Sequence, residues 1–145
     1  MPDHGVRAAP LAGPLHAILL AFPVALYPAT LLADIAYLNT EVIQWTNFAQ
    51  WLNAGADFSA GLLLAWAAIS FFVGRGRHHR GRSLTYLIVV ALMFVLGLIN
   101  AFQHSGDAWS SVGTLGLVLS IACAVLAIIA AFLAHSSTTH RGVRA

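Results

Sequence analysis

Four long apolar stretches constrain this chain more than any other feature. They lie at about residues 15–38, 54–73, 84–103 and 112–134. A helix rises about 1.5 Å per residue, so each stretch is long enough to cross the roughly 30 Å hydrocarbon layer of a bilayer. Only 8% of the residues are charged, whereas a soluble domain carries about a quarter. We therefore predict an all-α integral membrane protein, in which residues 1–145 form a single transmembrane domain, an up-down bundle of four helices.

The segment at residues 42–53, just before the second apolar stretch, has two interpretations. Its large apolar residues recur at helical spacing, and they are Val42, Trp45, Phe48 and Leu52. The segment is either an interfacial helix that lies along the membrane surface or a long extension of the second span.

The arginines predict how the chain is oriented in the membrane. With four spans, both termini and the loop "GRGRHHRGR" fall on one side, and that side holds every basic residue: Arg7, Arg75, Arg77, Arg80, Arg82, Arg141 and Arg144. Basic residues gather on the cytoplasmic side of membrane proteins. We therefore place both termini in the cytoplasm. This position explains the basic run without a nucleic-acid partner.

Polar residues near the opposite, outer ends of the spans are predicted to meet in one cluster. They are Asp34, Asp57, Asn100, His104 and Asp107. Asp57 is placed in the first turn of the second span, at a depth similar to that of the others. Polar groups in a membrane are costly and therefore face the interior of a bundle. The cluster is interpreted either as hydrogen-bonded helix ends or as a cation site built from one histidine and three carboxylates.

Histidines mark the inner ends of the first and fourth spans. His16 and His135 lie at matching depths on antiparallel helices, so the pair could bracket a haem b between them. In the other interpretation His16 is a hydrogen-bonding anchor near Tyr86, and His135 is an interfacial residue. His16 and Asp34 share one stripe of the first span, but about 27 Å of helix separates them, so they do not form one site.

Small residues predict which helix faces pack together. Lipid provides no hydrophobic drive between helices, so close packing through small side chains must hold them. Such faces are predicted on the second span at Gly61, Ala65 and Ala68, and on the fourth at Gly113, Gly116, Ser120, Ala124, Ala127 and Ala131. Pro23 and Pro28 are expected to bend the first span. The lone cysteine, Cys123, lies within an apolar run and is interpreted as a packing residue.

The stretch "GPLHAILLAFPVALYPATLLADIAY" resembles the opening of a widespread bacterial family of uncharacterised four-helix inner-membrane proteins. Members begin with Gly-His-Pro-x-His-Pro and continue to a Phe-Pro pair and an aspartate near the end of the first span. The matching residues here are Pro14, His16, Phe22, Pro23 and Asp34. Gly13 replaces the first histidine and Ala17 the second proline. The resemblance, looser over the rest of the chain, implies the four-helix fold and a layout similar to two-haem cytochrome b proteins.

Three functions are consistent with the sequence. The favoured one is a small non-catalytic membrane protein, an accessory or anchoring subunit that binds other subunits of a redox or photosynthetic assembly. It follows from the small extramembrane mass and from a sequence without a Gly-x-Ser-x-Gly, phosphate-loop or His-Glu-x-x-His motif. The first alternative is an electron-transfer module that holds haem b or meets quinone. The second is a cation or proton carrier, disfavoured because no acid is placed at the middle of the membrane.

Overall fold

The computed structural model describes residues 13–73, 80–106 and 112–136. These residues form four helices, α1 (Pro14–Thr40), α2 (Ile43–Val73), α3 (Arg80–His104) and α4 (Thr114–His135), and they contain no strand. Each helix is long and apolar enough to cross a membrane. The predicted all-α fold of four membrane-spanning helices is confirmed.

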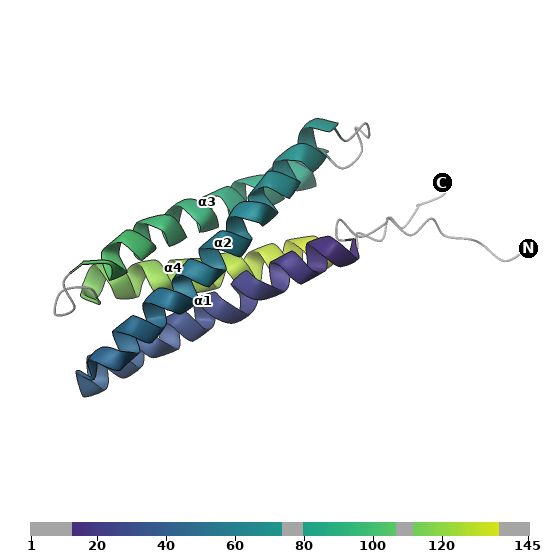
Figure 1. The fold of residues 1–145 in the computed structure, drawn as a ribbon. Coiled ribbons are helices and arrows are strands. Elements are labelled where there is room, and N and C mark those ends of the chain that lie inside the picture. The colour runs from purple at the N-terminus through teal and green to yellow at the C-terminus, as the bar shows by residue number, and fades with distance from the viewer. Residues whose placement is uncertain (1–12, 74–79, 107–111, 137–145) are drawn as a thin grey trace, which may run out of the picture.

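The four helices form a closed ring in chain order. α1 packs on α2, α2 on α3, α3 on α4, and α4 again on α1. The start of α1, the end of α2, the start of α3 and the end of α4 lie at one end of the bundle (Figure 1). We name this the terminal end and the other the opposite end. The assignment of the terminal end to the cytoplasm stays a prediction from the arginines.

Helix α1 is continuous from Pro14 to Thr40 and includes both internal prolines. Pro14 lies in the first turn, where the backbone N–H that proline lacks would have no helical partner. The helix ends at Glu41, which has the left-handed backbone conformation (φ 54°) and donates its N–H to the carbonyl of Tyr37 at 2.7 Å. The position of this end sets the turn into α2.

Helix α2 begins at Ile43, so residues 43–53 are an extension of the second span and not a separate helix. The extension is held in place by its own buried stripe, because Thr46, Ala49 and Asn53 face the bundle at helical spacing. The expected position of Asp57 along its helix was therefore wrong. Asp57 lies near the middle of α2, not in its first turn.

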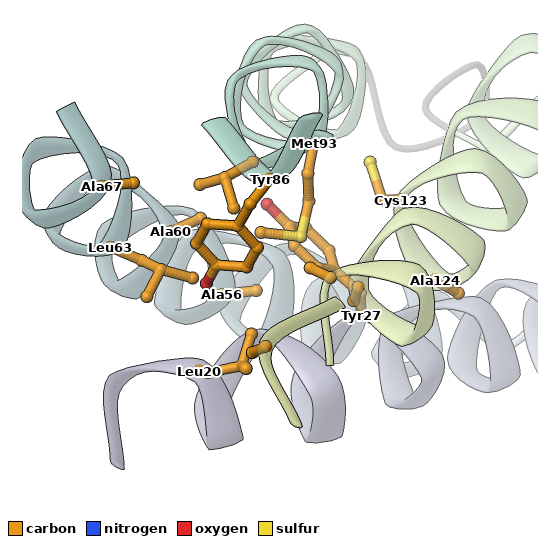
Figure 2. Close-up of a cluster of buried hydrophobic side chains, with 14 residues drawn as sticks. Leu20, Tyr27, Ala56, Ala60, Leu63, Ala67, Tyr86, Met93, Cys123 and Ala124 are labelled. Carbon is orange, nitrogen blue, oxygen red and sulfur yellow. The ribbon is translucent and has the colours of Figure 1, made fainter. Parts of the chain in front are cut away.

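Small side chains bring the helices together, as expected, but not at every expected position. On α4 the predicted face is buried at Gly116, Ser120, Ala124 and Ala127. On α2 the buried small residues include Ala49, Ala56, Ser59, Ala60 and Ala67, whereas Ala65 is exposed. The buried face of α2 is therefore rotated from the predicted one. Between the helices lie the large core side chains of Leu20, Leu63, Tyr86 and Met93 (Figure 2).

Arg82 joins α3 to α4 at the terminal end. Its guanidinium donates from Nε (3.2 Å) and Nη2 (2.6 Å) to the carbonyl of Leu133, and from Nη2 to the carbonyl and hydroxyl oxygens of Ser136. The last carbonyls of a helix have no partners within the helix. Arg82 therefore supplies from α3 the donors that the C-terminus of α4 lacks.

Candidate functional site

Asp34 and His104 form an ion pair inside the bundle, near the opposite end. His104 Nε2 lies 2.8 Å from Asp34 Oδ1, and both side chains are 0% exposed. The other ring nitrogen, Nδ1, lies 2.9 Å from the carbonyl oxygen of Asn100. A carbonyl only accepts hydrogen bonds, so Nδ1 carries a hydrogen and donates it. Nε2 and Oδ1 are joined by one further hydrogen bond.

Ser120 and Asn100 extend this pair to α4 and across α3. The Ser120 hydroxyl donates to Asp34 Oδ2 at 2.5 Å and accepts from Asn100 Nδ2 at 2.9 Å. Asn100 Nδ2 also donates to Asn53 Oδ1, at 3.4 Å. Both carboxylate oxygens of Asp34 therefore have partners, and the chain of hydrogen bonds continues to α2.

Asp57 is the second buried carboxyl group, and it lies closer to the middle of the bundle along the helix axes. Its Oδ1 accepts from the hydroxyl of Tyr27 at 2.6 Å, and its Oδ2 accepts from Asn53 Nδ2 at 3.3 Å. Asn53 Nδ2 also donates to the backbone carbonyl of Gly97 at 3.1 Å. A Cβ atom at Gly97 would collide with Asp57 Oδ1 and the Tyr27 hydroxyl. Glycine at this position lets α3 approach the Asp57 carboxyl group.

These side chains form one continuous set, which we name the polar network: Tyr27, Asp34, Asn53, Asp57, Asn100, His104 and Ser120. All four helices contribute to it. Among the described residues, Asn100 Oδ1 is the single side-chain atom of the network without a hydrogen-bond partner. A buried network with nearly every group paired fixes the positions of its members, and it is costly to break.

Four of the five residues predicted to cluster belong to the polar network, and the fifth, Asp107, lies outside the described residues. In the described part of the chain, no three His, Cys, Asp or Glu side chains come together as metal ligands. The two carboxyl groups have separate partners: Asp34 bonds to His104 and Ser120, and Asp57 bonds to Tyr27 and Asn53. These bonds agree with the hydrogen-bonded interpretation, and the cation site stays a prediction.

Sequence reasoning missed three members of the network. Asn53 was left inside a segment with two interpretations, although its spacing of four from Asp57 is the signal of a shared helix face. Ser120 was treated only as a small packing residue. Tyr27 lies on the stripe that His16 and Asp34 share, but no partner was predicted for it. Each of the three also bonds to a residue of another helix, and only the packed bundle shows these contacts.

His16 and His135, the two predicted haem ligands, lie in different surroundings. His16 is buried, and its Nε2 lies 2.8 Å from the hydroxyl of Tyr86. His135 is exposed, and its Nδ1 donates to the carbonyl of Ala131 on its own helix at 2.9 Å. The first lines a small cavity between α1, α2 and α3, and the second lines a surface groove with Val24 and Phe132.

The predicted haem between His16 and His135 meets two different surroundings: the cavity beside His16 is small, whereas the groove beside His135 measures about 420 Å³. The Nε2 atom of His16 is already bonded to Tyr86, and the cavity beside it measures about 40 Å³. Pockets for organic ligands usually measure about 300–1,000 Å³. A porphyrin or a quinone ring therefore has no room beside His16 in this conformation.

No curated protein and no solved structure matches this chain. Residues 12–145, which include all four helices, match the family described as "Predicted membrane protein (DUF2231)". The match agrees with the resemblance carried by Phe22, Pro23 and Asp34 of the first span. The chain therefore belongs to this family of membrane proteins.

Proposed function

We propose that this protein is a non-catalytic accessory subunit that binds a transmembrane helix of another membrane protein. The observation that carries the proposal is the outward face of α1. Four alanines recur there at every fourth position, at Ala17, Ala21, Ala25 and Ala29. Ala21 and Ala25 are exposed, and the other two are half-buried.

The outward face of α1 combines these alanines with large apolar side chains such as Ile18 and Phe22, whereas the outward faces of α3 and α4 carry no exposed alanine among the described residues. Their exposed residues are large and apolar: Ile88, Leu92 and Val95 on α3, and Val118, Ile121 and Val125 on α4. Such side chains suit contact with lipid tails. Small residues at every fourth position instead allow two helix backbones to approach closely, which is how helices associate within a membrane. The middle of α1 therefore presents a surface suited to a partner helix.

The interior of the bundle supports the same proposal. The polar network pairs its side chains with one another across all four helices. This pairing makes the bundle a rigid scaffold and leaves the outer surface as the part that can bind other molecules. A scaffold with a small-residue face is what an anchoring subunit requires.

Substitution of Ala25 by tryptophan tests this proposal. The indole would hold a partner helix away from α1, so we expect the amount of a co-purifying membrane protein to fall several-fold. Val125→Trp places the same side chain on the outward face of α4 and should leave the amount unchanged. Each tagged variant is extracted from native membranes in a mild detergent, and its partners are quantified by mass spectrometry. Equal partner retention in both variants, or self-association alone, would contradict the accessory role.

A proton carrier is a second candidate, because Asp57 and Tyr27 are paired near the middles of their helices. A proton relay across the membrane requires an acid near the middle of the spans, and the sequence analysis expected no acid there. Proteoliposomes with an internal pH dye and an imposed potential test the idea. Proton uptake that Asp57→Asn abolishes would favour a carrier, and the absence of uptake in the wild-type protein would exclude it.

A further inference from the structure

His16 has one nitrogen whose partner is not accounted for. The side chain is 2% exposed, and its Nε2 is bonded to Tyr86. Its Nδ1 has no hydrogen-bond partner among the described residues. An unpaired buried polar atom is costly, so such atoms in folded proteins usually bind a water molecule or another group.

A cavity of about 40 Å³ adjoins this histidine. It is lined by side chains of α1, α2 and α3: His16, Trp66, Ala67, Ser70, Phe71, Ser83 and Tyr86. A cavity needs about 10–15 Å³ to hold one water molecule, which must find two to four polar partners there. The hydroxyls of Ser70 and Ser83 and the imidazole of His16 supply such partners. The cavity therefore has both the room and the chemistry for water.

We propose that water occupies this cavity and bridges His16 Nδ1 to the hydroxyl groups of Ser70 and Ser83. Water both donates and accepts hydrogen bonds, so it satisfies Nδ1 whether or not that nitrogen carries the hydrogen. An apolar group, such as a lipid tail, satisfies it in neither case. The site is independent of the proposed partner face, which lies on the outward side of α1.

The bridge would complete the contacts among the helices at the terminal end. There the hydrogen bond between His16 and Tyr86 joins α1 to α3, and Arg82 joins α3 to α4. The bridging water adds α2 through Ser70. Towards the opposite end, the apolar side chains of Leu20, Leu63, Val90 and Met93 lie between this cavity and the polar network along the helices (Figure 2 shows Leu20, Leu63 and Met93). Water at His16 is therefore confined to the terminal end.

Water-edited solid-state NMR on histidine-labelled protein in lipid bilayers tests the proposal. His16→Gln identifies the His16 signals by their loss. We expect rapid magnetisation transfer from water to His16 in the wild-type protein. His104 provides the internal control, because both of its nitrogens are bonded to protein groups and its transfer should be slow.

Two cavity variants make the test specific. Ser70→Leu fills the cavity from α2, and Ser83→Val fills it from α3, so each should slow the transfer to His16 at least several-fold. Unchanged His104 signals show that a variant is folded, and if one variant fails to fold the other decides. Slow transfer to His16 in the wild-type protein, or transfer unaltered in a folded variant, would overturn the proposal.

Discussion

Replacement of Asp34 by leucine is expected to destabilise the protein by about 3–5 kcal/mol, the usual cost of removing one partner from a buried ion pair. Leucine would leave His104 Nε2 and the Ser120 hydroxyl without the acceptors that they have in the folded protein. Neither group reaches bulk water. Unfolding of the purified protein, followed by circular dichroism during titration of a mild detergent with SDS, measures the change.

Asp34→Asn is the matched control for this prediction. The amide can donate from its nitrogen to a neutral His104 and accept the Ser120 hydroxyl on its oxygen, so both contacts survive. We expect less than about half of the loss seen with leucine. If asparagine destabilised the protein as much as leucine does, the charge of Asp34 would matter more than its hydrogen bonds, and our account of the pair would be wrong.

Gly97→Ala is expected to produce the second large effect, about 1–3 kcal/mol from overpacking alone. The added methyl group would collide with the Asp57 carboxylate and the Tyr27 hydroxyl, which are bonded to each other. Either α3 moves away from α2 or the hydrogen bond breaks, and both outcomes reduce stability. The same SDS titration measures the loss.

Gly81→Ala is the control for Gly97→Ala. Gly81 also lies in α3, but a methyl group added there meets no other atom. Alanine is the better helix former, so this variant should be neutral or slightly stabilised. In a second comparison, Tyr27→Phe removes one of the two colliding atoms. Its effect and that of Gly97→Ala should therefore not add, and strict additivity would argue against the close approach at Gly97.

The sequence was sufficient to predict the four helices, because hydrophobic length alone specifies a membrane span. It did not determine where α2 begins. Residues 42–53 contain both polar and aromatic residues. Their apolar residues recur at helical spacing, which a helix on the membrane surface and a helix within the bundle would both show. Burial of Thr46, Ala49 and Asn53 against other helices decides the matter, and such tertiary packing is not visible in the spacing of one segment.

The polar network was predictable in part. The cost of polar groups in lipid correctly predicts that Asp34, Asn100 and His104 face the interior. Which partners they bond to depends on how each helix is rotated and on where α2 begins, and the sequence determines neither. Consequently Asp57 was predicted in the first turn of the second span, whereas it lies near the middle of α2, and its bond to Tyr27 was missed. At the terminal end, the expected meeting of His16 with Tyr86 is found in the structure.

The contact between Asp34 and His104 lies at the centre of this account and can be measured directly. Protein labelled with ¹³C at the aspartate carboxyl groups and ¹⁵N in the histidine rings is reconstituted in bilayers, and the dipolar coupling between the two labels is recorded. We expect a strong coupling in the wild-type protein that is lost in Asp34→Asn and retained in Asp57→Asn. Absence of the coupling in the wild-type protein, or its survival in Asp34→Asn, would contradict the contact between Asp34 and His104 inside the bundle.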